Sequence, residues 1–543
     1  MSKGIRYLSG ILALAATFML CSCQPGGKTT KATTKGSDVT TSSKTTTSKQ
    51  TTQKQTTTKR TTTKGTTTRR TTTERKTTTE RITTQAITTQ QQIDNGKVVN
   101  VLLWNDEFQQ RVRNYYRDNG EEIEVLSPNI YLLPDGTKIK WTMVANEGSA
   151  YQNALDDSLK DGDVDIFAFE PDYSYKYING AYSSYVASMA DINLDQSQQY
   201  QYIKDVLKDK NGVSKGTSWQ VCPGMYAVNM NAVSDVFGDS FATVATMKDR
   251  LSSESKFSGL GIDMEMFDAR YSLLVGPGEL FYYHLCQIGS EMYDRTTKTI
   301  TVDEALFRYA DMALEYAQEG FLQGTGNEYY SWSTKWNEAD LANSKVIAKF
   351  CPIWYADWVL PTTCEAKYDD DGDLIASSAP WRLVSGFDNS FWGGTCLGIT
   401  EVGIEDDVKK ASIASILTKM TADKTTMRAL SDGERDLTNN MSAMQEKAED
   451  TTVSDPFYGG QNTFAVSHEA ALAANAPVYC NYYLDIVENF QRSFMDYISQ
   501  SGTASSCWAD FISNLKHVNS ELTIQADPNV IIDNYITFKS EIK

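Results

Sequence analysis

The sequence predicts an α/β fold on two observations. Val99–Leu103 is a short apolar run, and it is followed at once by Phe108 and Val112 at helical spacing. An apolar run of this length is typical of a buried strand. Residues 139–170 then carry an alternating strand, a helical stripe and a second buried strand. We therefore expect a βαβαβ unit over residues 97–170.

Later segments continue the alternation of helices and strands. Thr301 and Glu304 form a capping box that predicts a helix ending at Gly320. The other expected elements are a strand interrupted by Pro-Gly at 219–230, which suits a crossing between lobes, helices before and after residues 276–279, a strand at 346–350 and a helical C-terminal region.

The N-terminus has the features of an export signal. Lys3 and Arg6 precede an apolar run at residues 11–20, far shorter than the roughly 20 residues that a bilayer-spanning helix needs. Residues 20–23, Leu-Cys-Ser-Cys, resemble the bacterial lipobox. This resemblance implies a signal peptide over residues 1–22 and acylation of Cys23, which would hold the protein on the membrane. A plain secretory cleavage site is the alternative.

Residues 23–96 are expected to form a disordered tether. They are mostly Thr with Lys, Arg and Gln, so they bury too little apolar surface to offset the entropy of ordering. As a random coil, about 65 residues span roughly 45 Å. Fourteen basic and four acidic residues give residues 24–96 a charge of +10, which suits contact with an anionic surface. A soluble spacer is the alternative.

The charge of the chain is divided unevenly. The whole chain of 543 residues has a net charge of −18, but residues 97–543 carry 35 basic and 65 acidic residues, a net charge of −30. A surface this negative repels phosphate backbones, which argues against nucleic acid as a partner and favours neutral or cationic small ligands. These 447 residues suffice for two or three domains, or for one large two-lobed unit.

The cysteines and histidines predict no metal site and no cofactor. An odd, scattered set of cysteines without a CxxC pair is a poor disulfide framework, so we expect mostly buried thiols, with Cys351 and Cys364 the pair to test first. The three histidines, His284, His468 and His517, have no ligand spacing. Residues 369–373 lack the spacing of a calcium loop and indicate a hairpin turn. The remaining five cysteines are Cys222, Cys286, Cys396, Cys480 and Cys507.

Polar and aromatic side chains follow two of the expected strands. Trp104, Asn105 and Asp106 come directly after the first strand, and Asp172 follows the strand at 163–170. Ligands of α/β sheets gather at the carboxyl ends of the strands, so these side chains are candidate contacts. The alternative is that Trp104 is core and that its neighbours cap the next helix. We interpret Glu107 as a helix-start carboxylate.

The order of these features resembles the extracellular solute-binding lipoproteins of bacterial ABC carbohydrate importers, relatives of maltose-binding protein. The resemblance is carried by the lipobox, the tether, the strand ends at Trp104-Asn105-Asp106 and Asp172, the Pro-Gly crossing, the Trp354 region, the Phe391-Trp392-Gly393-Gly394 turn and the aromatic C-terminal helix. It implies a two-lobed periplasmic-binding-protein-like fold with hinge crossings and a cleft between the lobes. The first lobe would comprise about 97–221 and 384–455, and the second about 222–383 and 456–543.

The resemblance also implies further site residues. Trp354 and Tyr458 fall where the family places stacking aromatics, and Gly278 with Glu279 matches a turn that contributes a carboxylate. Asp357 and Trp392 complete the expected set of ligand contacts. Most tryptophans in a chain with ten are core, and for Trp219, Trp332 and Trp336 core is the favoured interpretation.

The function implied is capture of an oligosaccharide by lobe closure, and its delivery to the permease of an ABC transporter by a lipid-anchored monomer. A glycoside hydrolase is disfavoured, because a carboxylate pair is easily found among 65 acids and no other catalytic motif is present. The sequence also allows a surface adhesin for carbohydrate, or a binding protein for peptides or another polar solute.

Overall fold

The computed structural model describes residues 97–237, 271–341, 343–369, 374–376, 381–385, 390–434 and 436–527. The expected signal peptide, Cys23 and the tether lie outside these residues, as do most of the helix expected before residue 276 and most of the turn at 369–373. In the described part of the chain, no helix is both long and apolar enough to cross a membrane.

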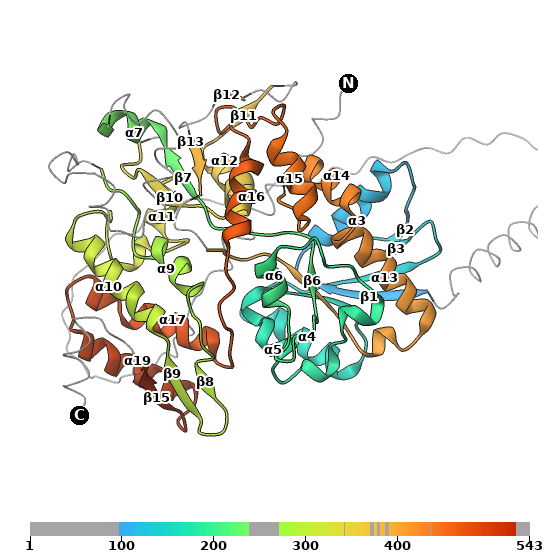
Figure 1. Ribbon diagram of the computed structural model, residues 1–543, viewed down its shortest axis with the longest axis horizontal. Helices are drawn as coiled ribbons and strands as arrows, with labels where there is room; N and C mark the ends of the chain where they lie inside the picture. Colours follow the sequence, from blue (N-terminus) through green and yellow to red (C-terminus); the bar gives the residue numbers. More distant parts are fainter. Residues whose placement is uncertain are drawn as a thin grey trace, which may run out of the picture. The chain divides into compact units, whose positions relative to one another are not determined.

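A seven-stranded sheet, with order β2-β3-β4-β1-β5-β14-β6, forms the first lobe (Figure 1). Its central strand β1 pairs in parallel with β4 and β5, while β14 pairs antiparallel with β5 and β6. The strands are β1 (Val98–Leu103), β2 (Glu124–Ser127), β3 (Ile130–Leu132), β4 (Lys138–Met143), β5 (Ile166–Phe169), β6 (Thr217–Ser218) and β14 (Cys396–Ile399).

The βαβαβ prediction for residues 97–170 is confirmed. Helix α3 (Glu107–Asp118) connects β1 to the next part of the sheet, and α4 (Ala150–Asp161) connects β4 to β5. Val99, Val101 and Leu102 of β1 are at most 2% exposed, and Phe108 of α3 packs into the same core. The sequence did not predict the β2–β3 hairpin, because β2 is mostly exposed and β3 has a single buried side chain, that of Tyr131, so neither strand has an apolar periodicity.

The second lobe contains a smaller, antiparallel sheet. Strand β7 (Tyr226–Asn229) lies between β10 (Ala348–Phe350) and β13 (Trp381–Val384), which confirms the strands expected near 219–230 and 346–350. A third sheet has the order β15-β9-β8, with β8 (Tyr293–Asp294), β9 (Thr299–Val302) and β15 (Thr523–Ala526). A hairpin joins β11 (Lys367–Tyr368) and β12 (Leu374–Ala376).

The capping box at Thr301 was a wrong prediction. Helix α10 (Glu304–Gln318) is capped by Asp303, whose carboxylate accepts from the Ala305 N–H at 3.0 Å. Thr301 belongs to β9, which pairs with both β8 and β15, so its backbone is extended and committed to the sheet. The predicted end of the helix at Gly320 is confirmed, with Gly320 at φ +74°.

The remaining helices cover these sheets and the C-terminal region. They are α5 (Ser174–Ile178), α6 (Gln201–Val206), α7 (Met230–Phe237), α9 (Gly278–Leu285), α11 (Thr334–Glu338), α12 (Leu360–Thr363), α13 (Asp407–Thr421), α14 (Lys424–Glu434), α15 (Met441–Glu449), α16 (Thr463–Ala473), α17 (Tyr483–Ser493), α18 (Met495–Ile498) and α19 (Ala504–Val518). Val487, Phe490 and Phe494 form the predicted apolar stripe and are at most 2% exposed.

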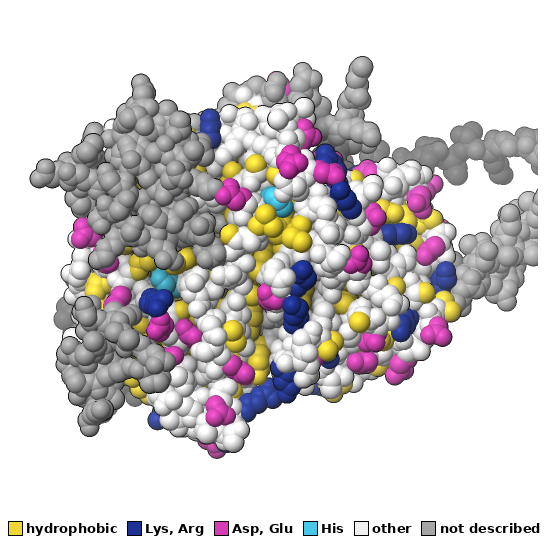
Figure 2. Space-filling model, in the orientation of Figure 1, with side chains coloured by type: hydrophobic (Ala, Val, Ile, Leu, Met, Phe, Trp, Pro, Cys, Tyr) yellow, Lys and Arg dark blue, Asp and Glu magenta, His cyan; other side chains and the backbone are white. Residues whose placement is uncertain are grey.

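Two hydrophobic cores meet where the chain crosses between the sheets. The first core fills the seven-stranded sheet and continues to Trp336 and Tyr355, and the second joins β7 and β10 to the C-terminal helices. Half-buried Trp392 and Tyr479 pack against both cores. Figure 2 shows a band of hydrophobic side chains down the middle of one face, between the elements of the two lobes in Figure 1.

Candidate functional site

The carboxyl ends of β1 and β5 lie at the same edge of the first sheet, because the two strands run in parallel. Trp104 follows β1 and is half-buried, and its ring meets Tyr151 edge-to-face at 5.2 Å. The Tyr151 hydroxyl donates to the carbonyl of Ala168 at 2.6 Å and lies 3.1 Å from that of Leu102. Tyr151 therefore ties the two strand ends together beneath Trp104.

Asn105, Asp106 and Glu107 form the start of α3. The side-chain oxygen of Asn105 accepts from the Glu107 N–H at 3.2 Å, and the Asp106 carbonyl accepts from the N–H of Gln110. Asp106 occupies the N-cap position, but its carboxylate makes no capping hydrogen bond. Glu107 lies in the first helical turn, as predicted, and pairs with Arg111 at 3.3 Å. Among these residues, Asp106 has a half-buried carboxylate that the helix start does not use.

Asp172 lies opposite groups of the second lobe. Asp172 is exposed, yet the dense surrounding protein, together with the negative charges of Glu170 and Glu488, raises its pKa to about 7. The negative charge of Asp172 raises the pKa of Tyr479, which precedes α17, and that of Tyr483, the first residue of the helix.

Four half-buried aromatic residues gather where the two cores meet, and we call them the aromatic cluster: Tyr282, Trp332, Trp354 and Trp392. Trp392 is stacked on Tyr282, with centroids 4.1 Å apart and planes at 21°. Trp332 is stacked on Trp354 at 5.6 Å and 15°. Trp354 meets Trp392 edge-on at 5.2 Å and 72°, so the two stacked pairs form one wall.

The crossing between β13 and β14 holds this wall in place. The Trp354 indole N–H donates to the Trp392 carbonyl at 2.9 Å. Gly393 follows at φ +77°, and a Cβ there would lie 3.3 Å from the same indole nitrogen. The turn therefore needs glycine both for its backbone conformation and for the close approach of Trp354.

Asp172 and the aromatic cluster lie near each other. Cys286 caps the C-terminus of α9, one helical turn after Tyr282, and its thiol has an electrostatic interaction with Asp172. The same thiol lies 3.9 Å from the carbonyl of Phe391, the residue before Trp392. Of the expected set, the structure thus brings Trp354 and Trp392 into contact, and the charge of Asp172 acts on the Cys286 thiol beside Phe391.

Four other expected site residues are buried. Glu279 is 1% exposed, and its carboxylate accepts from the Trp336 indole N–H at 2.7 Å and from the N–H of Phe350. Burial raises the pKa of Glu279 to about 8. Tyr458 is 1% exposed and donates to the Ala356 carbonyl at 2.7 Å. Gly278 opens α9 and Asp357 lies in a π-helical turn at Tyr355–Val359, and both are buried.

Tyr282 was not among the residues that the sequence predicted for the site, and Trp332 was predicted to be a core residue. Tyr282 follows Glu279 by three positions on α9, a spacing that places two helical residues on neighbouring parts of one face. No sequence pattern indicated that Trp332 belongs to the site. Its side chain is placed by a loop conformation with a φ of +66°, which the sequence does not predict. Trp219 and Trp336 are core, as predicted, at 1% exposure each.

The seven cysteines of the folded part are all buried thiols, and Cys351 and Cys364 form no disulfide. Within the described ranges, no group of three or more His, Cys, Asp or Glu side chains is arranged to hold a metal ion. His284 is buried against the Leu280 carbonyl, and burial lowers its pKa to about 4.

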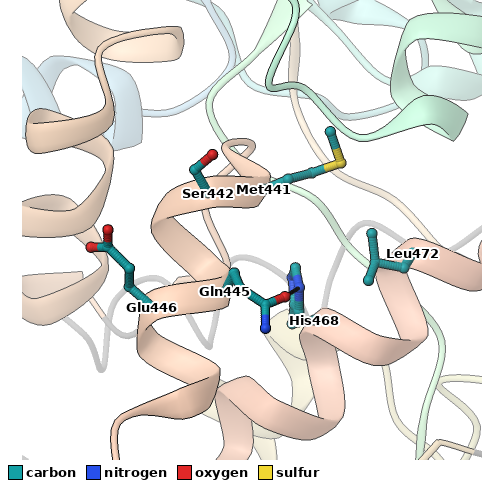
Figure 3. A pocket seen from close by; sticks show the side chains of 6 residues that line it. All are labelled: Met441, Ser442, Gln445, Glu446, His468 and Leu472. Carbon is teal, nitrogen blue, oxygen red and sulfur yellow. Dashed lines mark hydrogen bonds between the residues drawn. The ribbon is translucent and has the colours of Figure 1, made fainter.

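A hollow of about 380 Å³ lies elsewhere, on the surface between α15 and α16. Its lining, drawn in Figure 3, includes His468, whose ring nitrogens lie 2.5 Å from the Tyr200 hydroxyl and 2.8 Å from the Gln445 side-chain oxygen. Both nitrogens are thus occupied within the protein. We place the candidate site at Asp172 and the aromatic cluster, where polar and aromatic groups converge.

Comparison with solved structures shows the fold. The chain is similar to a crystal structure of an extracellular solute-binding protein of family 1, with a TM-score of 0.61 and 13% identity over 77% of this chain and 99% of the other. It is also similar to the sugar-binding protein MalE of Xanthomonas citri, with a TM-score of 0.52 and 12% identity over 78% and 97% of the two chains. No protein-family model and no curated protein sequence matches the chain.

A third similar structure is the ABC transporter associated binding protein of B. animalis subsp. lactis in complex with β-1,6-galactobiose. Its TM-score is 0.50 and its identity 12%, over 79% of this chain and 99% of the other. The chain therefore has the two-lobed α/β fold of the extracellular solute-binding proteins.

Proposed function

We propose that the protein is a cell-surface lipoprotein that captures a short oligosaccharide between its lobes and delivers it to the permease of an ABC transporter. The observation that carries this proposal is the aromatic cluster beside the Asp172 carboxylate, at the junction of the two cores. Sugar-binding structures of the same fold support the ligand class.

The chemistry of the site suits a sugar. A pyranose has an apolar face and a rim of hydroxyl groups, so it needs flat aromatic surfaces and planar acceptors. Each stack contributes about 0.5 to 1.5 kcal/mol beyond area burial, and each hydrogen bond to a carboxylate contributes about 1.5 to 3 kcal/mol. Two of each sum to roughly 4 to 9 kcal/mol, and micromolar affinity needs about 8.

The proposed ligand contacts divide between the two lobes. Trp354 and Trp392 offer stacking surfaces, and Asp172 accepts hydroxyl groups, with Trp104 and Asp106 at the rim of the first lobe. Asn105 already serves the start of α3. Buried Gly278, Glu279, Asp357 and Tyr458 support the wall instead of contacting the ligand.

The proposal includes a lipid anchor at Cys23 and a transporter permease as the partner. Acylation at Cys23 and a flexible tether at 23–96 would let the domain at 97–543 work at the outer face of the membrane. A second role, holding polysaccharide at the surface without transport, is favoured by the basic, Thr-rich composition of the tether. An import assay with and without the gene distinguishes the two roles, because an adhesin does not change sugar uptake.

A thermal-shift panel tests the ligand class. The probes are maltotriose, cellotriose, xylotriose and β-1,6-galactobiose, with a lysine-rich tripeptide as the contrasting ligand. We expect at least one sugar to raise the melting temperature and to change tryptophan fluorescence. A shift with the peptide but with none of the sugars would overturn the ligand class, and release of shorter sugars would show an enzyme instead.

A further inference from the structure

Trp332 lies in the middle of the aromatic cluster with a backbone conformation that bulky residues rarely adopt. Its φ of +66° is in the left-handed region. Its ring is stacked on Trp354 and meets Trp392 at 6.1 Å and 62°. A residue persists in such a conformation only where its surroundings over-determine it, which is common at binding sites. The neighbouring side chains therefore have to hold Trp332 there.

Trp336, four residues later, is the first of those neighbours. It is 1% exposed, and its ring lies 5.3 Å from that of Trp332. The Lys349 ammonium lies 3.6 Å from the centroid of the Trp336 ring, and Glu279 accepts from its indole N–H. A cation on the ring and an acceptor at its edge together fix both the plane and the direction of this indole.

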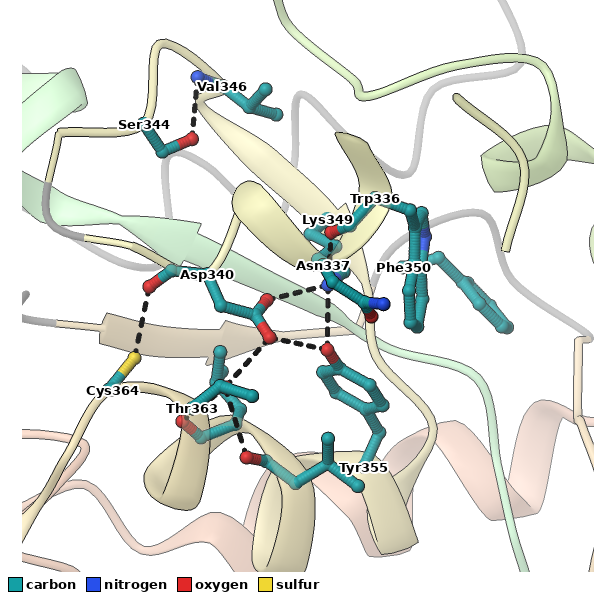
Figure 4. Close-up of polar contacts among 12 residues, drawn as sticks. Trp336, Asn337, Asp340, Ser344, Val346, Lys349, Phe350, Tyr355, Thr363 and Cys364 are labelled. Atoms are coloured by element: carbon teal, nitrogen blue, oxygen red, sulfur yellow. Dashed lines mark hydrogen bonds and ion pairs between the residues drawn. The ribbon is translucent and has the colours of Figure 1, made fainter. Parts of the chain in front are cut away.

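Lys349 is itself held in one orientation, as Figure 4 shows. Its three ammonium protons have three acceptors, namely the Asp340 carboxylate at 2.6 Å, the Tyr355 hydroxyl at 2.7 Å and the Trp336 carbonyl at 2.8 Å. Lys349 is 1% exposed and Asp340 0%. We call the Lys349–Asp340 ion pair, together with the Glu279 carboxyl beside it, the buried charge cluster.

The same cluster reaches the wall by a second route. The Tyr355 hydroxyl donates to Asp340 at 2.5 Å, and the Tyr355 ring lies 5.8 Å from Trp332 and 5.9 Å from Trp354. Thr363 donates to the same carboxylate at 2.8 Å, which ties it to α12. Stability alone does not call for this arrangement, because apolar side chains of equal volume commonly replace a buried ion pair without loss. Hydrogen bonds to charged groups differ from apolar packing in that they fix the orientation of the neighbouring side chains.

We propose that Trp332 is a third aromatic contact of the ligand, and that the buried charge cluster positions it through Trp336 and Tyr355. This rests on the proposed function, since it concerns the same site. Glu279 and Lys349 are then positioning residues, which act on the ligand only through the tryptophans between them.

The test compares two substitutions of buried tryptophans. Trp336→Phe removes the indole N–H that Glu279 accepts, while Trp141→Phe makes the same change at a 2% exposed position of β4, away from the cluster. In the full chain we expect Trp336→Phe to weaken binding of the best sugar of the panel about tenfold, with no change for Trp141→Phe. Near-ultraviolet circular dichroism reports the Trp332–Trp354 stack, and we use it for the double variant described next, because that variant keeps every tryptophan.

Two further variants keep the proposal falsifiable if Trp336→Phe folds poorly. The double variant Lys349→Met, Asp340→Asn removes both members of the ion pair and keeps every tryptophan, so it should give the same loss of affinity and a changed near-ultraviolet spectrum. Trp332→Ala tests the direct contact and should weaken binding at least tenfold. Wild-type affinity in Trp332→Ala, or wild-type affinity with an unchanged spectrum in the double variant, would overturn the proposal.

The experiments distinguish a failure of the proposed sugar binding from a failure of the proposed positioning role. If no sugar of the panel shifts the wild-type protein, Trp332 loses its role as a sugar contact. The circular dichroism comparison still decides the positioning role, because it needs no ligand: a wild-type spectrum in the Lys349→Met, Asp340→Asn variant would overturn that role as well.

Discussion

Asp172 combines features that a surface carboxylate does not have. Water reaches it, but dense surroundings and the nearby charges of Glu170 and Glu488 raise its pKa to about 7. Such a group changes its charge near neutral pH, so it makes the site sensitive to pH. At higher pH it offers a charged acceptor, which gives stronger hydrogen bonds to hydroxyl groups than a neutral one.

Asp172→Asn therefore has a pH-dependent effect on binding. We expect about a tenfold loss of sugar affinity at pH 8.5, where wild-type Asp172 is ionised. The loss should become small at pH 5.5, because the wild-type carboxyl is then neutral as well. Isothermal titration calorimetry at both values measures it, and an equal loss at both would contradict the assignment.

Asp172→Asn should weaken sugar binding at high pH, but it should raise the stability of the folded protein there. Because the folded pKa of Asp172 is raised, the folded protein binds more protons than the unfolded chain between about pH 4 and 7, so this residue lowers stability as pH rises through that range. Asp172→Asn should remove that decline and be more stable than wild type at pH 8. Urea unfolding at several pH values checks this, and parallel curves for both proteins would refute it.

At the scale of elements, the crossing between β13 and β14 decides where the tryptophans lie. The turn at Gly393 and Gly394, with φ of +77° and +104°, carries Trp392 into the cluster and lets Trp354 bond to its carbonyl. A side chain at position 393 would strain the backbone, which has a positive φ, and would crowd the indole of Trp354.

Gly393→Ala should therefore lower both stability and affinity. The strain of the left-handed conformation costs about 1 to 2 kcal/mol, and displacement of Trp354 adds a loss of sugar binding. Gly320→Ala is the matched control, since Gly320 has φ +74° but no atom within 4 Å of its Cβ position. It should lose similar stability and keep full affinity. Equal affinity in the two variants would show that the turn does not position Trp354.

At the scale of the whole molecule, the two lobes touch beside the candidate site. The Tyr175 hydroxyl of α5 donates to Glu291, which precedes the second-core residue Met292, at 2.9 Å. Tyr479 packs against both cores and interacts with Asp172. These contacts are the ones that opening of the lobes would break.

Sugar binding should thus be coupled to closure. We expect the best sugar of the panel to reduce the radius of gyration of the full chain in small-angle scattering. Tyr175→Phe removes one exposed hydrogen bond and should weaken binding only about twofold, whereas Tyr185→Phe, an exposed tyrosine of the same lobe, should have no effect. An unchanged radius on binding would contradict capture by closure.

The elements of the first lobe could be predicted because their signals are local. The buried runs of β1 and β5 and the stripes of α3 and α4 are readable from short windows of sequence. The start of α10 was misplaced because Thr301 belongs to β9, which pairs with β15, and the partner of Thr301 there is Gln525, 224 residues away in the chain. Pairing partners at such distances leave no trace in a local pattern.

The residues of the candidate site could be predicted only in part. The sequence by itself determined the βαβαβ unit, the acidic domain, and the polar and aromatic residues after the strands, because these follow from periodicity, charge and position. Only the tertiary structure decided that Glu279 and Tyr458 are buried and that Trp332 joins the wall. The physical reason is that side-chain exposure at a junction of two cores depends on packing between segments distant in sequence.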